Sequence, residues 1–260
     1  MSEELRVHET GPVAVLAMNR PAVRNALSLT LLQELASTVN ALAARPDLRV
    51  VVLRGEGELP FSAGYDMKGI GDARLTADDA RKLHAPVRAV ADALGDCPHV
   101  VVAAARQFVF GAGLDLFLHC DLRLGAEGTT FCMPPNRYGF LYPAEGIQRL
   151  IAVAGLARAE KMLLTGTPLT TDEALACGIV QQVLTGAEWE AGLAALCDTL
   201  AANAPLSMRG TKQLLRSLQP RDAASADSLY QRIAECLNSE DVRESQRAFR
   251  EKRKPLFRGA

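Results

Sequence analysis

Two short glycine-bearing segments constrain this chain more than any other feature. The segment Phe61–Lys68 follows the apolar run 50–53, and the segment Phe110–Asp115 follows the apolar run 100–105. Each run is rich in valine and each segment leads toward a helix-compatible stretch, so both predict a tight turn from a strand into a helix. Glycine permits such turns and lets a ligand approach the backbone without meeting a Cβ. Two turns of this kind can aim free backbone N–H groups into one pocket.

Backbone N–H groups that are fixed in place suit a reaction in which negative charge accumulates on a carbonyl oxygen. A helix that starts at Gly113 would add the positive end of its dipole at the same point. Each segment taken alone is also consistent with a turn that uses glycine for geometry only. Because the chain contains both segments, we interpret them as the two halves of an oxyanion hole.

Apolar runs typical of β-strands alternate with helical patterns over most of the chain. Leucine and valine recur at helical spacing behind the N-cap candidate Ser28 and predict a first helix. Thr76 and Asp79 have the spacing of a capping box for a second helix, in which Pro86 should cause a break or a kink. The alternation predicts an α/β fold, with strand-like runs at 13–17, 50–53, 100–105, 122–124 and 179–184.

The pattern changes from about Ala201 onward to helices without strands. We therefore predict a core at residues 1–200 and a helical region at residues 201–260. A region this small cannot bury its own apolar faces, so it should dock on the core or on a neighbouring subunit. The apolar positions at helical spacing are Leu206, Leu214, Leu215, Leu218, Leu229, Ile233 and Leu237.

Composition and charge exclude several classes of protein. The chain has 260 residues with 48% hydrophobic content, which is enough for a sizeable core. Its 29 Lys plus Arg and 30 Asp plus Glu give a net charge of −1, which provides no global field for nucleic acid or a membrane surface. The first residues lack signal-peptide features and no run reaches the roughly 18 apolar residues of a membrane span, so we expect a cytoplasmic location. The six cysteines show no close pairing, which favours free thiols over disulfides or a metal site.

The two glycine segments belong to an ordered set of motifs that spans nearly the whole chain. The set begins with Asn19-Arg20-Pro21 and Arg24-Asn25-Ala26-Leu27 and continues, after the two glycine segments, with Gly146–Leu150, Leu164–Gly166, Ala174–Val180 and Phe249–Phe257. In this order the motifs resemble the crotonase, or enoyl-CoA hydratase/isomerase, superfamily. The resemblance implies an α/β fold that is a crotonase-like spiral of ββα turns with a C-terminal helical oligomerisation region.

The resemblance also implies an activity and partners. Members of the superfamily process acyl-CoA thioesters by stabilising a thioester enolate, so coenzyme A would enter as part of the substrate. No permanently bound cofactor and no metal is expected. The implied reaction is hydration, dehydration or double-bond isomerisation of an enoyl-CoA. A homotrimer, or a hexamer made of two trimers, is the expected assembly, with neither nucleic acid nor a membrane as a partner.

Individual residues take roles from the same resemblance. The amide N–H groups of Tyr65 and Ala112 would bind the thioester oxygen. Asp66 could also orient its own loop, because aspartate commonly accepts hydrogen bonds from nearby backbone amides. Coenzyme A would be held by Arg24, Ala63, Asp66, Lys68, Lys254 and Phe257, the last two acting on the coenzyme A of an adjacent protomer.

The acid/base residues depart from the hydratase pattern. Relatives that add water to a double bond typically use two glutamates. The first falls on Asp115, and the second falls on Pro135, which cannot transfer a proton. Glu145, at the predicted start of a helix, is a second candidate for proton transfer, although a carboxylate there also suits the helix dipole alone. The departure leaves open a CoA-thioester hydrolase or decarboxylase on the same fold, and a non-catalytic member that binds acyl-CoA or another partner.

Side chains near Asp115 extend this candidate site. His119 follows Asp115 by four residues, so a carboxylate–imidazole pair on one helical face is possible, and apolar neighbours on both sides should bury the carboxylate. Tyr138 and Tyr142 flank Gly139 and could contribute a hydroxyl to the pocket or pack in the core.

Overall fold

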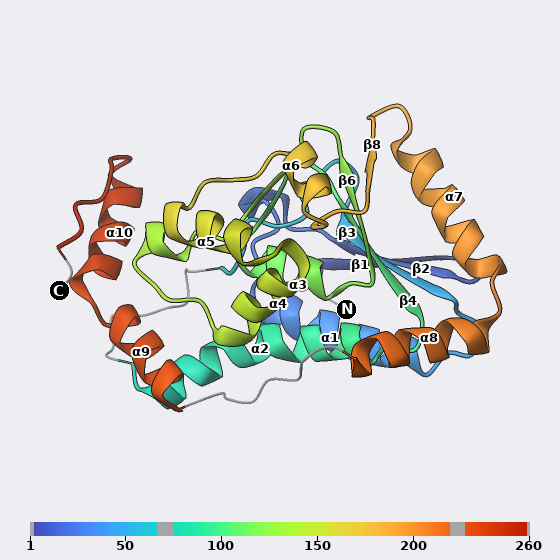
Figure 1. Ribbon diagram of the computed structural model, residues 1–260, viewed down its shortest axis with the longest axis horizontal. Coiled ribbons are helices and arrows are strands. Elements are labelled where there is room, and N and C mark those ends of the chain that lie inside the picture. Colours follow the sequence, from blue (N-terminus) through green and yellow to red (C-terminus); the bar gives the residue numbers. More distant parts are fainter. Residues whose placement is uncertain (1–2, 67–74, 219–226, 259–260) are drawn as a thin grey trace.

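The computed structural model describes residues 3–66, 75–218 and 227–258. Strands and helices alternate up to residue 184, and the described residues after it form helices (Figure 1). The strands are β1 (Leu5–Thr10), β2 (Val13–Met18), β3 (Val50–Gly55), β4 (Val100–Ala105), β5 (Phe108–Phe110), β6 (Leu122–Ala126), β7 (Thr130–Cys132) and β8 (Gln182–Leu184). The helices are η1 (Pro21–Val23), α1 (Leu29–Ala43), α2 (Ala77–Asp96), α3 (Ala112–His119), η3 (Pro135–Tyr138), α4 (Ala144–Ala154), α5 (Leu156–Thr165), α6 (Thr171–Ala176), α7 (Trp189–Ala202), α8 (Pro205–Ser217), α9 (Asp227–Leu237) and α10 (Glu240–Arg250).

Six strands form the main sheet in the order β1-β2-β3-β4-β6-β8. β1 pairs with β2 in antiparallel orientation, and the other neighbours pair in parallel. β5 and β7 form a second, parallel pair. Isolated bridges extend this second layer, since Ser62 pairs with Val109 of β5 and Tyr65 pairs with Leu27. The second layer therefore places the first glycine segment directly beside β5.

Alternate residues of the main-sheet strands enter two different cores, as the two-residue period of a strand requires. Val50 and Val52 of β3 pack in a core with Trp189 of α7. Val51 and Leu53 pack in the larger core, which contains residues of α1, α2 and α3. Figure 1 shows α7 on the side of the sheet away from α1 and α2. Because both faces of the sheet are covered, the sequences of the central strands are continuous apolar runs.

The chain winds through repeated turns, each made of a main-sheet strand, a short second-layer segment and a helix. The first consists of β3, the segment around Ser62 and α2; the second of β4, β5 and α3; the third of β6, β7 and α4. This is the spiral of ββα turns that the motif set implies, so the predicted fold class is confirmed. Since β3 and β4 are neighbours in the sheet, the loops that follow them are neighbours as well.

The helix signals in the sequence are largely correct. The Ser28 side chain accepts a hydrogen bond from the Leu31 N–H at 3.0 Å, and Thr76 with Asp79 forms the predicted capping box. Pro86 does not break the second helix, because α2 continues through it, and the alternative of a kink stays a prediction. Proline removes one intrahelical bond, to the carbonyl of exposed Lys82, which water can satisfy, while the buried face of α2 holds the helix in place.

Strand prediction succeeds for buried strands and fails for short or exposed ones. β4 has the predicted bounds, and the run at 179–184 contributes only β8. β1 escapes detection because it is an edge strand whose sequence, LRVHET, is mostly polar. β5 and β7 have three residues each, too few for a period to be seen.

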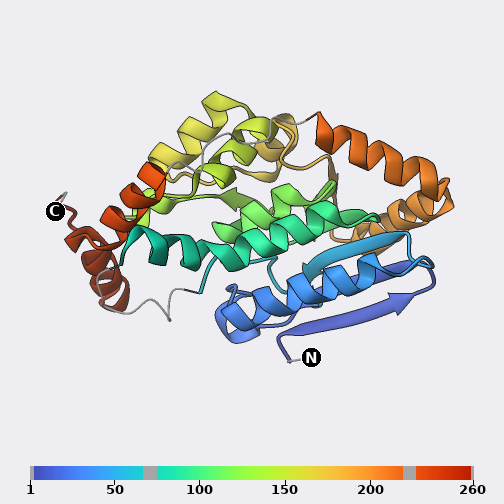
Figure 2. The ribbon, with the colours of Figure 1, turned by 90° about the horizontal axis from the view of Figure 1, so that it is seen from below.

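The C-terminal helices behave in two different ways, and Figure 2 shows α9 and α10 at the end of the molecule opposite to α8. Tyr230 and Ile233 of α9 are buried together with Ala80 of α2. α8 leaves its leucines in solvent, with exposed fractions of 83% at Leu206 and 80% at Leu218. α9 thus docks on the core, whereas the leucines of α8 do not, and their docking on a neighbouring subunit stays a prediction. The boundary at residue 200 stays a prediction.

α8 turns cationic side chains, not leucines, toward the core. Lys212 is 7% exposed, and its Nζ lies 2.6 Å from Oδ2 of Asp121 and 2.9 Å from the His99 carbonyl oxygen. Arg216 donates to the carbonyl of His119 at 3.2 Å. A Cβ on Gly95 would lie 2.1 Å from the Arg216 guanidinium, so a side chain there would require the guanidinium to move. Cations at the carboxyl ends of α2 and α3 suit both helix dipoles.

All six cysteines are free thiols, as predicted, and four of them are buried. Among residues 3–66, 75–218 and 227–258 there is no helix with the length and apolar content that crossing a membrane requires. The same residues contain no cluster of three or more His, Cys, Asp or Glu side chains suited to a metal ion.

Replacing Lys212 by methionine should destabilise the fold by about 3 kcal/mol, because it leaves the Asp121 carboxylate without its partner in a largely buried position. Lys82→Met is the matched control, since Lys82 lies 2.7 Å from Asp78 in an exposed ion pair and should change stability little. Urea unfolding followed by circular dichroism measures both. Equal effects of the two substitutions would show that α8 is not held by this pair.

Candidate active site

The backbones of the two glycine segments touch each other. A Cβ placed on Gly64 would lie 3.1 Å from the Phe110 carbonyl oxygen and 3.6 Å from the Gly111 Cα. Both glycines have positive φ, 100° and 52°, which glycine adopts at little cost. A Cβ on Gly113 would lie 2.5 Å from the Cβ of Ser62. The absence of side chains at these glycines lets the two segments approach this closely.

The N–H of Tyr65 points toward the second segment. Leu27 bonds to both neighbours of Tyr65: its N–H donates to the Gly64 carbonyl at 2.7 Å, and its carbonyl accepts from the Asp66 N–H at 3.0 Å. In a strand the residue between such neighbours directs its own N–H to the opposite side, where β5 and α3 lie. Ala112 is the first residue of α3, so its N–H has no intrahelical acceptor. Neither N–H donates a hydrogen bond to another described residue.

Asn25 anchors the segment that carries Tyr65. Asn25 is fully buried, and its Nδ2 donates to the Pro60 carbonyl at 2.7 Å. The Ser62 hydroxyl donates to the Asn25 carbonyl at 2.7 Å and accepts from the Gly64 N–H at 3.0 Å. Buried hydrogen bonds of this kind are costly to break, so the motif around Asn25 fixes the loop that precedes Tyr65.

Arg20 fixes the other end of the same loop. Its Nη1 lies 3.0 Å from Oδ2 of Asp66, and its Nε lies 2.9 Å from Oε1 of Glu4. The Asp66 carboxylate, predicted to help bind coenzyme A and to orient its own loop, is thus engaged by a guanidinium from the motif that precedes α1. The Ala63 N–H donates to the carbonyl of Arg24 at 3.1 Å, which brings these two coenzyme A candidates together.

Helix α3 carries the first acid/base candidate one turn after Ala112. Asp115 is 8% exposed, which confirms the predicted burial. Its Oδ2 accepts a hydrogen bond from the Tyr142 hydroxyl at 3.2 Å, and its Oδ1 is buried with no hydrogen-bond partner among the described residues. Nδ1 of His119 lies 3.4 Å from that Oδ1 but only 2.8 Å from the Asp115 carbonyl oxygen, to which it bonds. A donor from a ligand or water would satisfy Oδ1.

Three arginines from different elements hold the other end of α3. They donate to its last carbonyls: Arg149 to Leu118 at 2.7 Å, Arg216 to His119 at 3.2 Å, and Arg123 to Cys120 at 2.9 Å. Burial lowers the pKa of the Arg123 guanidinium to about 10, so it is still charged at neutral pH. The short helix is thus held at its carboxyl end by cations, while the first N–H groups of its N-terminus have no side-chain cap.

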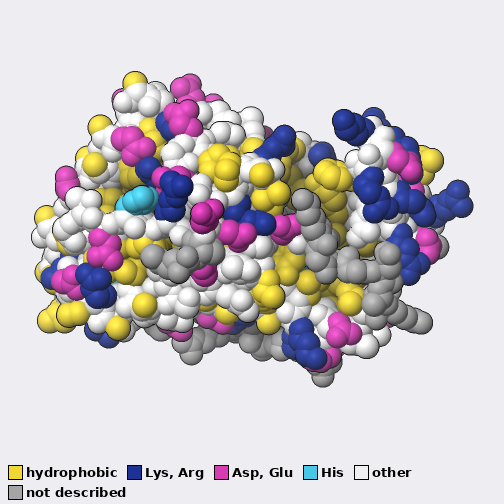
Figure 3. All heavy atoms as spheres, turned by 180° about the vertical axis from the view of Figure 1, so that it is seen from behind, with side chains coloured by type: hydrophobic (Ala, Val, Ile, Leu, Met, Phe, Trp, Pro, Cys, Tyr) yellow, Lys and Arg dark blue, Asp and Glu magenta, His cyan; other side chains and the backbone are white. Residues whose placement is uncertain are grey.

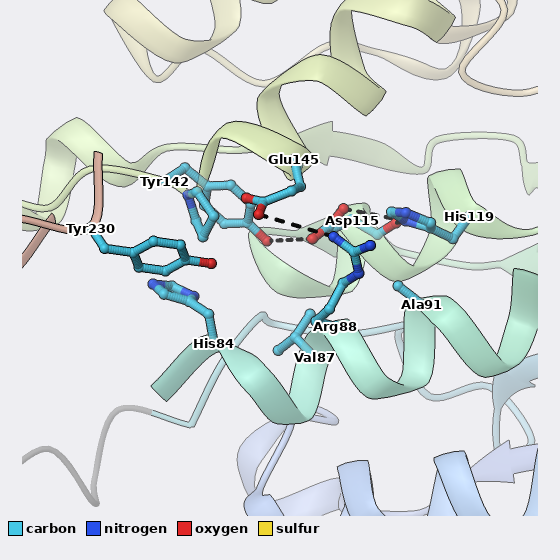
Figure 4. A pocket seen from close by; sticks show the side chains of 11 residues that line it. His84, Val87, Arg88, Ala91, Asp115, His119, Tyr142, Glu145 and Tyr230 are labelled. Atoms are coloured by element: carbon cyan, nitrogen blue, oxygen red, sulfur yellow. Dashed lines mark hydrogen bonds and ion pairs between the residues drawn. The ribbon is translucent and has the colours of Figure 1, made fainter. Parts of the chain in front are cut away.

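A cavity of about 50 Å³ lies among α2, α3, α4 and α9 (Figure 4). It brings together Asp115 and Glu145, which the sequence proposes as the two acid/base groups. Its other polar side chains are His84, Arg88, His119, Tyr142 and Tyr230. Tyr65 and Ala112 do not line it, because the cavity begins one helical turn beyond Ala112.

Glu145 stands in the first turn of α4, as predicted. Its Oε1 lies 4.0 Å from Nη1 of Arg88, and Arg88 also pairs with Asp92 at 2.8 Å. Burial raises the pKa of the Tyr230 phenol, and the charge of Glu145 raises it further. Figure 4 shows the Tyr230 ring reaching into the cavity from α9. The C-terminal helices therefore contribute to the candidate site directly.

Burial sets the protonation of two further side chains of the cavity. It lowers the pKa of His84 to about 4, against the opposing charge of Asp115. It raises the pKa of the Tyr142 phenol well above its usual value, and the Asp115 charge and hydrogen bond act in the same direction. At neutral pH His84 is uncharged and Tyr142 keeps its proton, so Tyr142 is a donor to Asp115.

The remaining described residues with predicted roles do not line this cavity. Pro135 is buried in η3, and Lys68 lies outside the described residues. Lys254 is exposed and Phe257 is 42% exposed, in the segment that follows α10. Figure 3 shows Lys and Arg side chains gathered at the end of the molecule where α10 lies. Lys254 and Phe257 are thus available to a neighbouring molecule.

Sequence reasoning does not single out Arg88 or Tyr230, and it gives His84 no role. His84, Val87, Arg88 and Ala91 line the cavity at positions i, i+3, i+4 and i+7 of α2, a spacing visible in the sequence. Tyr230 carries no comparable signal, because only the tertiary fold brings α9 against α2.

Protonation of His84 should make the folded protein lose stability in mild acid. The unfolded chain binds a proton near pH 6.5 and the folded chain only near pH 4, so stability is complete above pH 6.5 and falls as the pH drops toward 4. His84→Gln should reduce this acid-induced loss of unfolding free energy by at most about 3 kcal/mol. Urea unfolding at pH 7 and pH 4.5 measures it, with exposed His8→Gln as the control. An unchanged decrease in His84→Gln would contradict the assignment.

The family profile of enoyl-CoA hydratase/isomerase matches residues 8–260 of this chain. YngF of Bacillus subtilis (strain 168), which bears an enoyl-CoA hydratase/isomerase name, is 30% identical over 248 residues, or 95% of each chain. Carnitinyl-CoA dehydratase of Salmonella typhi is 28% identical over 100% of both chains.

Solved structures agree with the sequence comparison. An enoyl-CoA hydratase/carnithine racemase from Magnetospirillum magneticum superposes with a TM-score of 0.81 at 31% identity, covering 100% of this chain and 97% of that chain. Methylmalonyl-CoA decarboxylase in complex with 2-nitronate-propionyl-CoA superposes with a TM-score of 0.88 at 28% identity over 100% of both chains. With this match over nearly its whole length, the chain belongs to the enoyl-CoA hydratase/isomerase family of the crotonase superfamily, whose enzymes process acyl-CoA thioesters.

Proposed function

We propose that this protein stabilises the enolate of an acyl-CoA thioester at the backbone N–H groups of Tyr65 and Ala112. One observation carries the proposal: two N–H groups without acceptors come from loops whose glycines are in contact. Donors held in place before charge develops stabilise an oxyanion without reorganising. The N-terminus of α3 adds the positive end of its dipole.

Asp115 is the residue best suited to move the α-proton. Its Oδ1 has no hydrogen-bond partner among the described residues, while the Tyr142 hydroxyl donates to Oδ2. Proton transfer from the substrate α-carbon to Oδ1 would move the bonding electron pair toward the thioester oxygen, where the two N–H groups receive the charge. The enolate then takes a proton back at another carbon, which isomerises the double bond, or expels hydroxide from the β-carbon, which completes a dehydration.

Glu145 is the proposed second acid/base group in place of the glutamate that Pro135 replaces. It faces the same cavity as Asp115, and Arg88 and Tyr230 line the cavity beside it, the Arg88 guanidinium as a fixed positive charge 4.0 Å from Oε1. In a dehydration it would protonate the departing hydroxide. A dehydratase, hydratase or isomerase acting on an enoyl-CoA or 3-hydroxyacyl-CoA is therefore the function that the site supports best.

Decarboxylation is the second candidate, and two observations favour it. Methylmalonyl-CoA decarboxylase structures superpose on this chain with TM-scores of 0.85 to 0.88. Loss of carbon dioxide from the α-carbon of a 2-carboxyacyl-CoA leaves the enolate directly, so the reaction requires no second carboxylate at Pro135. The same two N–H groups would stabilise this enolate. Release of free coenzyme A alone would instead indicate a thioester hydrolase.

Coenzyme A enters this proposal as part of the substrate, with no permanently bound cofactor. The loop that pairs Arg24 with Ala63 lies next to Tyr65, so it can receive the part of coenzyme A nearest the thioester. A long cationic side chain such as Arg24, or Lys68 beyond it, is a suitable partner for phosphate. Lys254 and Phe257 would serve the coenzyme A of an adjacent protomer.

The proposed assembly is a homotrimer, or a hexamer of two trimers. The exposed leucines of α8 support this assembly. Lys212 and Arg216 occupy the side of α8 that faces the core, so the apolar stripe of leucines is left uncovered in the protomer. Leucines of this kind pack well in obligate interfaces.

The catalytic proposal is tested with 2-enoyl-, 3-enoyl-, 3-hydroxyacyl- and 2-carboxyacyl-CoA thioesters in deuterated water, read by mass spectrometry. Wild type should form a product or exchange the α-proton with at least one class. Asp115→Asn should lower that rate by about 10² to 10⁴, and Glu145→Gln should lower dehydration more than α-exchange. Asp78→Asn, an exposed carboxylate on α2, is the control. Binding without product or exchange across the panel would favour a non-catalytic acyl-CoA-binding protein.

Replacing Leu214 and Leu218 together by glutamate should dissociate the assembly without unfolding the chain, because both leucines are exposed in the protomer. Light scattering after size-exclusion chromatography gives the mass, and circular dichroism reports the fold. Leu164→Glu, an equally exposed leucine on α5, is the control. A wild-type monomer, or a variant of unchanged mass, would remove α8 from the interface.

A further inference from the structure

Tyr142 lines two cavities of opposite character. The first is the polar cavity of about 50 Å³ that contains Asp115 and Glu145. The second has a volume of about 170 Å³. It is lined by Leu141, Ala144, Ile147, Gln148 and Ile233 together with Tyr142. Because Tyr142 lines both cavities, its side chain is in a position to form a wall between them.

The first cavity is small. A volume of about 50 Å³ accommodates roughly one or two waters, or the end of a short acyl chain. The second cavity is the larger of the two and its lining is almost wholly apolar, which suits hydrocarbon. A chain that extended from the first cavity in this direction would meet the tyrosine ring.

Several contacts hold the tyrosine in this position. Its hydroxyl donates to Oδ2 of Asp115 at 3.2 Å. The ring lies against Gly146, where an added Cβ would be 2.3 Å from Cε1. The His84 ring lies 6.3 Å away between centroids, and Figure 4 shows both rings at the same side of the cavity. Moving the ring aside would leave a second oxygen of buried Asp115 without a donor, which opposes opening.

We propose that Tyr142 determines the acyl-chain length that the site accepts. Its ring limits wild type to short acyl groups, and removal of the ring joins the polar cavity to the apolar one, so that longer chains bind. This inference rests on the proposed function in one respect: the acyl group occupies the cavity beside Asp115.

The experiment compares wild type, Tyr142→Phe and Tyr142→Ala by calorimetric titration with butanoyl-, hexanoyl- and octanoyl-CoA. Phenylalanine keeps the ring and removes the hydroxyl, so the difference between the two variants reports the wall alone. Wild type and Tyr142→Phe should bind butanoyl-CoA at least as tightly as octanoyl-CoA. Tyr142→Ala should bind octanoyl-CoA more tightly than butanoyl-CoA. Its affinity should increase by up to about fourfold for each methylene that enters the second cavity. Octanoyl-CoA should bind to Tyr142→Ala at least about tenfold more tightly than it binds to wild type.

A second substitution checks where the longer chain goes. Ile147→Trp fills the second cavity, so Tyr142→Ala with Ile147→Trp should lose the gain for octanoyl-CoA. Circular dichroism confirms that each variant is folded, and Tyr142→Val, which keeps more packing, makes the same test if alanine is not tolerated. Identical length profiles for alanine, valine and phenylalanine at position 142 would overturn the proposal, as would wild-type affinity that rises steadily with chain length.

The measurement separates this inference from the proposed function. Saturated thioesters need no turnover to report binding. A short-chain preference without any α-proton exchange would contradict catalysis and support the wall. Exchange of short thioesters with no change of length profile in Tyr142→Ala would contradict the wall and support catalysis. Absence of any thioester binding to wild type would overturn both.

Discussion

The backbones of Gly64 and Gly111 touch with no side chain between them, and the geometry of the candidate site depends on this contact. The topology requires it, because β3 and β4 are parallel neighbours and the loops that follow them leave the sheet at the same edge. Once these loops meet, the N–H groups of Tyr65 and Ala112 have no hydrogen-bond acceptor in the part of the chain that the structure describes. Two unsatisfied donors at one edge of a sheet are costly in an empty site and useful when a ligand oxygen arrives.

The position of helix α3 at this site depends on contacts from the rest of the fold. It has eight residues, too few to be stable alone, so tertiary contacts must fix it. Arg149 of α4, Arg216 of α8 and Arg123 of β6 bond to its carboxyl end, and Ser62 packs on its first turn at Gly113. α8 therefore links the C-terminal helices to α3. A surface that binds another subunit through the leucines of α8 would be one helix away from Asp115.

The sequence predicts the parts of this protein that depend on local patterns. Buried strands such as β4, the caps at Ser28 and Thr76, and the two glycine turns all follow from residues close together in the chain. The surroundings of Asp115 could be predicted only in part. The sequence names Tyr142 as a possible source of a hydroxyl in the pocket, and this hydroxyl donates to Asp115. His84 of α2 and Tyr230 of α9 could not be predicted, because only the tertiary fold brings these helices together. The apparent amphipathicity of α8 is misleading for a related reason, since its buried side is cationic.

Tyr142 ties substrate size to proton transfer. Aspartate is one methylene shorter than the glutamate of hydrating relatives, so the α-carbon of a substrate must come closer to α3 for Oδ1 to reach it. The Tyr142 hydroxyl holds the other carboxylate oxygen, and its ring narrows the cavity on the side facing α4. In the proposed mechanism, one side chain would therefore both orient the base and confine the acyl group beside it. A larger substrate could be admitted only by displacing the ring, which would release Asp115 at the same time. Short-chain selectivity and an aspartate base are, on this view, two consequences of a single contact.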